Sequence, residues 1–210
     1  VVLLGVLLLL KPNFYFFGIY IFCYFVWRLF FKRTEFSKKT VVRVILVALA
    51  GIAVFAGVRI VDSSINDFEK KARIYEAREK YADDLFKPST PLEHKFAYLQ
   101  MKDRGVTIET VLDRLYWGEK IFRTSFGEYG YTSVAASYGY YDFVRYLSII
   151  VLLVISFFAI KNGGWEGLGL VTITFGCGFL LLLAAFYQAW AVDFQAQGRY
   201  LLPIAGMVSI

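Results

Sequence analysis

The chain has 210 residues, of which 58% are hydrophobic and 19% are charged, and its formal net charge is +6. Soluble domains usually contain about 45–50% apolar residues, so this composition argues against a water-soluble monomer. Two cysteines and one histidine are too few for a disulfide framework, a thiolate metal site or a multi-histidine metal site. No P-loop, dinucleotide fingerprint, zinc pattern or EF-hand occurs, so we predict no cofactor and no metal.

The charged residues are concentrated in one segment of the chain. Residues 62–140 hold 12 Lys/Arg and 13 Asp/Glu, which leaves 11 basic and 4 acidic residues for the rest of the sequence. The positive excess lies beside apolar runs, and this explains the basic character without nucleic acid. We therefore predict an all-α polytopic membrane protein. Transmembrane helices are expected in 1–61 and 142–210, with a helical extracytoplasmic loop insert in 62–141.

Apolar runs define the predicted membrane spans. A helix needs about 20 apolar residues to cross roughly 30 Å of hydrocarbon, and helix is favoured because unpaired backbone groups are costly in lipid. The chain opens and closes inside apolar runs, without a methionine start or a charged tail, so we interpret these runs as truncated spans of a longer protein, the first followed by a Lys11-Pro12-Asn13 turn. Four complete spans are predicted at Phe14–Phe31, Val41–Val61, Phe143–Ile160 and Leu168–Val192, and the truncated spans at Val1–Leu10 and Tyr200–Ile210.

The loop between the first two complete spans sets the predicted orientation. Between Arg28 and Arg43 it carries six basic residues and one acid, Glu35, and the positive-inside rule places such a loop in the cytoplasm. The loop KNGGWEG would then also be cytoplasmic. The insert and the segment VDFQAQGR would face the outside, and the lipid bilayer is the first predicted partner.

Three helical segments are predicted within the insert. Ser64-x-x-Asp67 resembles an N-terminal capping signal, and the charged segment after it favours a solvated helix that ends before Pro88. A second short helix is expected over 92–104, with Gly105 as its C-terminal cap. The run 107–126 places apolar residues on one face, which either packs on the spans or lies at the headgroup boundary.

A tyrosine-rich segment precedes the third complete span. Rings of this kind form aromatic belts at the headgroup level, and that is the simpler interpretation. A stacking surface for a sugar or a lipid headgroup is the alternative, for which Tyr129 and Tyr131 are candidate substrate-binding residues. The tyrosines concerned are Tyr129, Tyr131, Tyr138, Tyr140 and Tyr141.

The most informative stretch is FQAQGRYLLP, residues 194–203, because it places polar groups and a cation where a span begins. The five N–H donors of Arg199 suit a phosphate or carboxylate, although arginines at a lipid interface often contact headgroups only. Gln195, Gln197 and Tyr200 are predicted to border a substrate pocket, and Asp193 could also hydrogen-bond a hydroxylated substrate or satisfy loop backbone. The catalytic residues are not identified by the sequence.

Three segments together carry a resemblance to a known family. QGRYLLP, the SFGEYGY segment and the Lys11-Pro12 turn after an apolar run resemble the C-terminal part of domain of unknown function family 2142, predicted multi-spanning prokaryotic membrane proteins. The Arg-Tyr-Leu-x-Pro element is also similar to a late-helix element of lipid-linked-sugar glycosyltransferases with the GT-C architecture. In those enzymes the acceptor-activating carboxylate lies in the first external loop, which would precede this chain.

The resemblance implies an envelope glycosyltransferase in a prokaryotic inner or plasma membrane. Its donor would be a polyprenyl-phosphate-linked sugar, its acceptor an external glycan or lipid, and Arg199 would bind the donor phosphate. An O-antigen ligase or polymerase is a second hypothesis, and it would give His94 and Arg104 a role. A non-enzymatic component of polysaccharide assembly or export is a third, while transport has little support from intramembrane polar residues.

Overall fold

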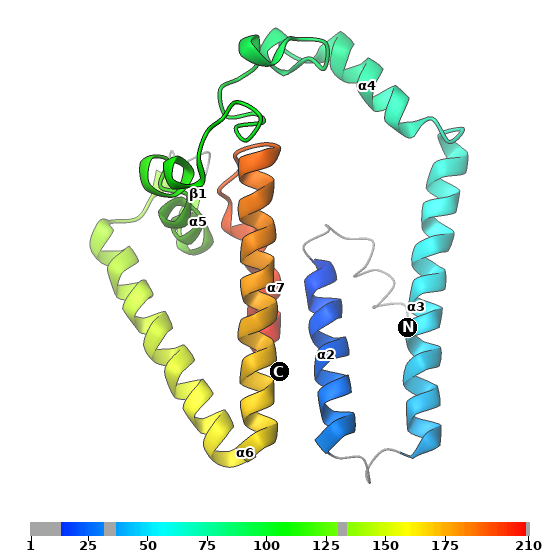
Figure 1. Cartoon of the computed structure of the whole chain (residues 1–210), viewed down its shortest axis with the longest axis vertical. Coiled ribbons are helices and arrows are strands. Elements are labelled where there is room, and N and C mark those ends of the chain that lie inside the picture. Colours follow the sequence, from blue (N-terminus) through cyan, green and yellow to red (C-terminus); the bar gives the residue numbers. More distant parts are fainter. Residues whose placement is uncertain (1–13, 32–36, 130–133, 209–210) are drawn as a thin grey trace.

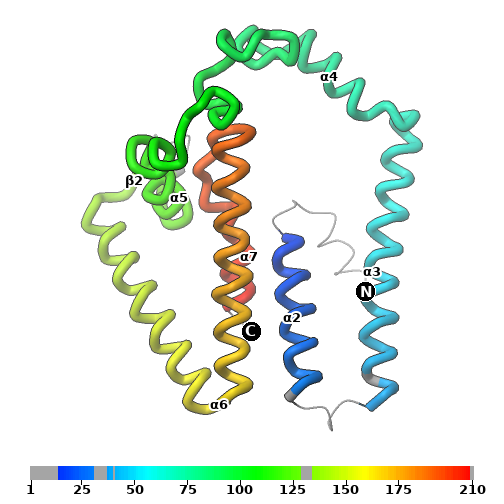
Figure 2. The backbone as a smooth tube through the Cα atoms, in the orientation of Figure 1, coloured from blue at the N-terminus to red at the C-terminus, as the bar shows by residue number. Residues whose placement is uncertain are grey.

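A computed structural model describes residues 14–31, 37–129 and 134–208 (Figures 1 and 2). The described chain is almost entirely helical, which confirms the predicted all-α class. Its long helices are α2 (Tyr15–Phe31), α3 (Lys38–Ile65), α4 (Lys70–Tyr81), α5 (Trp117–Phe126), α6 (Tyr138–Ala191) and α7 (Leu202–Val208). The short elements are η2 (Asp84–Phe86), η3 (Leu92–His94), the π-helical turn η4 (Thr110–Arg114), η5 (Gly198–Leu201) and the antiparallel pair β1 (Glu128–Tyr129) and β2 (Val134–Ala135).

Helix α6 is a hairpin of two helices that meet at Gly164. Gly164 has φ 53° and ψ −127°, a conformation that interrupts a helix and that glycine adopts without a Cβ penalty. Close to this bend a Cβ at Gly167 would lie 1.9 Å from the carbonyl oxygen of Ala159. The two arms contain the apolar runs 143–160 and 168–192, so the bend falls in the predicted KNGGWEG loop.

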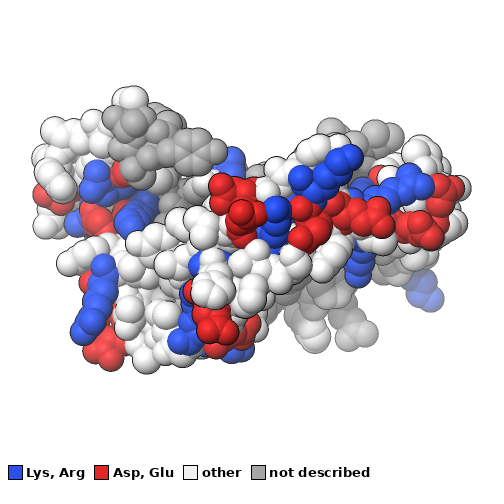
Figure 3. Space-filling view, turned by 90° about the horizontal axis from the view of Figure 1, so that it is seen from above, with Lys and Arg blue, Asp and Glu red and all other residues white. Residues whose placement is uncertain are grey.

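The bend of α6, the end of α2 and the start of α3 lie at the same end of the molecule, at the bottom of Figure 1. Arg28 of α2 and Glu166 of α6 form an ion pair there, with 3.2 Å between Nε and Oε1. The charged segment that contains α4 lies at the opposite end. Figure 3 looks down on that end and shows Lys/Arg and Asp/Glu side chains interspersed over it.

Two of the described helices, α3 over Val41–Ile65 and α6, are long and apolar enough to cross a membrane. Almost none of the most apolar stretch of either helix is buried within the protein. The apolar part of α2 is shorter. The predicted truncated span 1–10 and the Lys11-Pro12-Asn13 turn lie outside the described residues.

The helices form a closely packed body and a loosely attached arm. The body consists of α2, α5, α6, α7 and η5, which pack against one another, whereas the arm consists of α3 and α4. Glycines allow the closest contacts in the body. A Cβ at Gly169 of α6 would lie 1.9 Å from Cε2 of Trp27 on α2, and a Cβ at Gly206 of α7 would lie 3.1 Å from the ring of Phe17.

The junction between α3 and α4 corrects the predicted helix start at Ser64. Ser64 lies in the last turn of α3, which ends in a Schellman motif: the N–H of Phe68 donates to the Ser63 carbonyl over 2.7 Å, and the N–H of Asp67 donates to the Ser64 carbonyl over 3.1 Å. Asp67 and Phe68 have φ values of 52° and 60°, so the chain turns sharply before α4 begins. The Ser64-x-x-Asp67 pattern therefore terminates a helix.

The remainder of the insert is less regular than predicted. Of the helix expected over 92–104 only the single turn η3 forms, while Gly105 does adopt the left-handed conformation, with φ 76°. The predicted helix 107–126 is divided into η4 and α5 by Tyr116, whose φ is 53°. Its apolar face packs on α6: Val111, Trp117 and Ile121 are buried in one cluster with Ala189.

Candidate functional site

An open cleft of about 1100 Å³ lies between α4, with the loop that follows it, and the end of α6. One wall is a face of α4 and the loop that follows it, and the other is the last part of α6 with the segment after it. Phe16, at the start of α2, also lines it. The cleft is therefore at the α4 end of the long helices, opposite the bend of α6.

The cleft is lined by two chemically different sets of residues. Its apolar part includes Leu181, Ala184 and Ala185 of α6, and Leu181 is 2% exposed. Its polar part contains one carboxylate and three cationic side chains, together with glutamines and tyrosines. The charged lining residues are Lys71, Arg78, Lys95 and Asp193.

A chain of hydrogen bonds joins the polar residues at the end of α6. The Tyr200 hydroxyl donates to Oε1 of Gln195, and Nε2 of Gln195 donates to Oδ2 of Asp193. All three side chains line the cleft. The side-chain amide of Gln195 thus holds both Asp193 and Tyr200, one through its nitrogen and the other through its oxygen. Oδ1 of Asp193 takes no part in these two hydrogen bonds.

Backbone pairing with the insert holds this segment in place. α6 ends at Ala191, after which Leu99 and Asp193 form an antiparallel bridge. The N–H of Gln100 donates to the Val192 carbonyl over 3.0 Å, and the N–H of Phe194 donates to the Tyr98 carbonyl over 3.1 Å.

A series of aromatic contacts supports the same junction. The rings of Phe86 and Phe96 are 5.3 Å apart, those of Phe96 and Tyr98 are 5.4 Å apart, and those of Tyr98 and Phe194 are 5.6 Å apart. This series connects the loop after α4 to the start of the FQAQGRYLLP motif.

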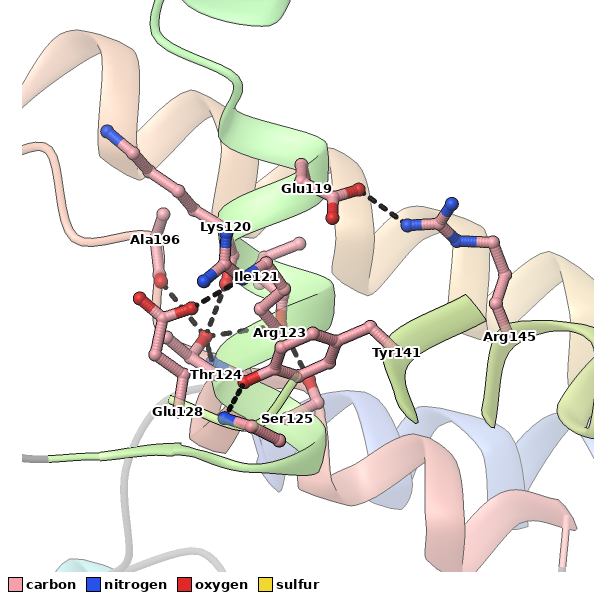
Figure 4. A network of polar contacts seen from close by, with 12 residues as sticks. Glu119, Lys120, Ile121, Arg123, Thr124, Ser125, Glu128, Tyr141, Arg145 and Ala196 are labelled. Atoms are coloured by element: carbon pink, nitrogen blue, oxygen red, sulfur yellow. Dashed lines mark hydrogen bonds and ion pairs between the residues drawn. The ribbon is translucent and has the colours of Figure 1, made fainter. Parts of the chain in front are cut away.

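The glycine of the motif has a packing role. The N–H of Gly198 donates to Oγ1 of Thr124 on α5 over 2.8 Å, and Thr124 Oγ1 also lies 3.1 Å from the Ala196 carbonyl (Figure 4). A Cβ at Gly198 would lie 2.1 Å from Oγ and 2.3 Å from Cα of Ser125. Only glycine permits this approach, so the motif is fixed against α5.

The structure brings two of the four motif residues predicted at the site into the cleft. Gln195 and Tyr200 line it, whereas Arg199 and Gln197 are not among its lining residues. Arg199 is exposed, its guanidinium lies 5.6 Å from the centre of the Tyr200 ring, and it makes no ion pair within the described part of the chain. Gln197 immediately precedes η5.

The tyrosine-rich segment lies in a separate corner beside α5. Tyr129 pairs with Val134 in the β-hairpin, and Tyr131 lies outside the described residues. Tyr141 is buried, and its hydroxyl accepts from the Ala136 N–H over 3.0 Å (Figure 4). The Tyr140 hydroxyl donates to the Phe126 carbonyl over 2.8 Å.

A buried ion pair stabilises this corner. Nε of Arg123 lies 2.8 Å from Oε2 of Glu128, which is 7% exposed, and the guanidinium is 5.0 Å from the centre of the Tyr141 ring. Burial acts to lower the pKa of Arg123, but the Glu128 carboxylate and the side chains of Tyr141 and Tyr138 outweigh it and raise that pKa. Arg145 and Glu119 form a second pair at 2.6 Å (Figure 4). These contacts within the protein give the polar residues of this corner a structural role.

His94 and Arg104 do not line the cleft. His94 is exposed in η3. Arg104 donates from Nε to the Leu99 carbonyl over 3.0 Å and from Nη2 to the Lys95 carbonyl over 2.9 Å. Arg104 therefore holds the loop that forms one side of the cleft.

Three residues of the cleft were missed as site candidates: Lys71, Arg78 and Lys95. Pairing along a helix explains the charges of this segment equally well, so the sequence predicts a solvated surface for them. A signal was present, because Lys71, Ile74, Tyr75 and Arg78 have the i, i+3, i+4, i+7 spacing of one helical face.

Cys23 and Cys177 are free thiols. In the part of the chain that the structure describes, no three His, Cys, Asp or Glu side chains gather into a group that could hold a metal ion. Comparison of the chain with protein-family models, curated proteins and solved structures gives no match.

Proposed function

We propose that the protein is an integral membrane, glycosyltransferase-like component of the cell envelope that binds a polyprenyl-phosphate-linked sugar in the external cleft. The observation that carries this proposal is the cleft itself, in which polar residues of the FQAQGRYLLP motif adjoin an apolar wall of α6. A lipid-linked sugar has the same division between a hydrated headgroup and a hydrocarbon chain.

The exposed apolar surfaces support the membrane setting of this proposal. The most apolar stretches of α3 and α6 are almost entirely unburied within the protein, and water would oppose that exposure whereas lipid would not. The basic segment between α2 and α3 favours a cytoplasmic location for its end, and the cleft would then open at the external leaflet. A membrane-impermeant maleimide should label Ser89→Cys from outside but not Lys38→Cys, in a chain without its two native cysteines. Labelling of Lys38→Cys alone would reverse the orientation.

The proposed reaction transfers the sugar to an acceptor hydroxyl. The acceptor oxygen forms a bond to the anomeric carbon as the carbon–oxygen bond to phosphate breaks, and the polyprenyl phosphate leaves with the electron pair. The acceptor proton requires a base, and among the described residues that line the cleft Asp193 is the only carboxylate. Oδ1 of Asp193 would accept it, while Gln195 and Tyr200 hold the carboxylate in position.

Sugar transfer in membrane vesicles that contain the full-length protein tests this function. The probe is a polyprenyl-phosphate-linked hexose with a radiolabelled sugar, and native membranes supply the acceptor. Asp193→Asn should lower transfer by roughly 10²–10⁴-fold, the usual contribution of a general base. Asp103→Asn makes the same change at an exposed turn outside the cleft and should leave transfer unchanged.

The same assay separates an enzyme from a non-enzymatic envelope component. Wild-type protein that binds the donor but neither transfers nor releases its sugar would contradict catalysis. Such a result would support lipid binding alone. The ligase alternative has less support, because Arg104 is hydrogen-bonded to backbone carbonyls and His94 lies outside the cleft.

A further inference from the structure

We propose that one face of α4, together with Lys95, forms a phosphate-binding subsite that holds the headgroup of the ligand at the arm side of the cleft. This inference rests on the proposed function for the place where the ligand binds. It assigns the phosphate to Lys71, Arg78 and Lys95, residues of the charged insert, and not to Arg199 of the motif.

The spacing of the α4 residues places two cations on the same surface. Lys71 and Arg78 are seven residues apart, which is close to two helical turns, and both line the cleft. Arg73 and Lys80 of the same helix lie on the opposite face. Arg73 pairs there with Asp67, and Nζ of Lys80 is 5.1 Å from the centre of the Tyr81 ring.

The cations of the cleft are not neutralised by neighbouring carboxylates. Within the described residues neither Lys71 nor Arg78 forms an ion pair, and Nζ of Lys95 donates to the Pro88 carbonyl over 3.2 Å. The single carboxylate of the lining, Asp193, is bonded to Gln195 on the other wall. The arm side of the cleft therefore has an excess of positive charge, carried by side chains that can also donate hydrogen bonds.

Phosphate fits this arrangement better than a neutral headgroup does. The guanidinium of Arg78 can donate two parallel hydrogen bonds to phosphate oxygens, and the lysine ammonium groups add point charges around them. Such charge-assisted hydrogen bonds are stronger than neutral ones, and the partly enclosed cleft screens them less than open water would.

The apolar wall indicates that the phosphate belongs to an amphiphile. Leu181, Ala184 and Ala185 of α6 and Phe16 of α2 line the same cleft. A hydrocarbon chain attached to the phosphate can lie along these residues, while the hydroxylated part of the headgroup reaches Gln195 and Tyr200. Free phosphate would use the cations without using the apolar wall.

Direct binding measurements on the full-length protein in neutral detergent test this subsite. Three probes are compared by calorimetry: dihexanoyl phosphatidic acid, inorganic phosphate and dihexanoylglycerol, which lacks the phosphate. The variant is Lys71→Gln/Arg78→Gln, and the matched control is Arg73→Gln/Lys80→Gln, with the same loss of charge on the opposite face of α4. Circular dichroism verifies that both variants remain helical.

Phosphatidic acid should bind to the wild-type protein, and the Lys71→Gln/Arg78→Gln variant should lose roughly tenfold in affinity for each cation removed. The control should stay within about twofold, since its residues lie outside the cleft. Lys95→Gln alone should give about a tenfold loss. Binding of inorganic phosphate with equal affinity would assign the site to the free anion, and much weaker binding would assign it to a lipid phosphate.

The subsite is disproved if the variant and its control bind phosphatidic acid equally, or if dihexanoylglycerol binds as tightly as phosphatidic acid. These results are independent of catalysis. A protein that passes the binding test but never transfers sugar would contradict the proposed function alone. A protein that transfers sugar with Lys71 and Arg78 replaced, at unchanged donor affinity, would contradict the subsite alone.

Discussion

The body and the arm both consist mainly of helices, but these helices are stabilised in different ways. In the body, glycines allow helices to approach until side chain meets backbone, as at Gly169 with Trp27 and at Gly198 with Ser125. In the arm, α3 exposes most of its apolar residues and packs extensively against no other described element. Apolar composition alone therefore does not determine whether a helix is held by protein or by its surroundings.

Among the glycine substitutions, the largest effect is expected at Gly198. Gly198→Ala would place a methyl group within 2.3 Å of the Ser125 backbone, which cannot move without displacing α5. We expect a loss of about 3 kcal/mol in the free energy of unfolding, at the upper end of the usual range for overpacking. Denaturant unfolding in detergent measures it. Gly118→Ala, which adds the same methyl group to open space on α5, should change little, and equal losses would disprove the contact.

A smaller loss is expected at Gly169. A Cβ there would overlap the Trp27 ring, but a side chain can rotate away more easily than backbone can move, so Gly169→Ala should cost about 1–3 kcal/mol. Tryptophan fluorescence should also change, because Trp27 must move. Gly176→Ala is the control on the same helix, since nothing lies within 4 Å of its Cβ position. A Gly169→Ala protein with unchanged stability and fluorescence would contradict close packing between α2 and α6.

Acid should loosen the contact between α4 and the loop that follows it. Hydrogen bonds from the hydroxyl and the N–H of Ser89 lower the pKa of Glu79 below its ordinary value of 4.5. Because the folded pKa is the lower one, this stabilisation is present above pH 4.5 and is lost as the pH falls through the folded value.

Hydrogen exchange at the Ser89 amide checks this pH dependence. Exchange should accelerate below about pH 4.5 more than the intrinsic chemistry predicts. In Glu79→Gln this acceleration of exchange should be absent. An acceleration of the same size in that variant would assign the effect to another titrating group.

The smallest effect is expected on α3. Leu49 is 56% exposed, so Leu49→Ala should change stability in detergent by about 0.5 kcal/mol or less. The same substitution at Leu181, which is 2% exposed on α6, should cost about 2–5 kcal/mol. Comparable losses at the two positions in thermal unfolding would show that α3 packs against protein after all.

Much of the helical architecture could be predicted from sequence, because its causes are local. The apolar runs predicted where α2, α3 and both arms of α6 form, and KNGGWEG predicted the bend at Gly164. Gly105 was predicted to cap a helix over 92–104; it has the left-handed conformation of such a cap, but the helix does not form. The end of α3 was not predicted, because a Ser-x-x-Asp pattern suits a helix start and Asp67 adopts the left-handed conformation that more often belongs to glycine.

The site was harder to predict than the helices. Gln195 and Tyr200 were identified because polar residues are conspicuous at the start of an apolar run. Lys71 and Arg78 were not, because a cation that faces a cleft and a cation that faces water look alike in a helix of mixed charge. Tertiary contacts between the insert and the end of α6, among them those of Leu99, Gln100 and Phe194, bring α4 to the cleft.

The sharp turn at Asp67 and Phe68 joins α4 directly to the end of a long helix. At 1.5 Å per residue the 25-residue candidate span of α3, Val41–Ile65, extends for about 38 Å, more than the roughly 30 Å of hydrocarbon in an average bilayer. A helix of this length relieves hydrophobic mismatch by tilting, and a thinner bilayer requires a larger tilt. Since α4 is attached to the end of α3, a change in the tilt of α3 should change the width of the cleft. Distances between spin labels at Ser89 and Gln188 in bilayers of different acyl length would measure this coupling.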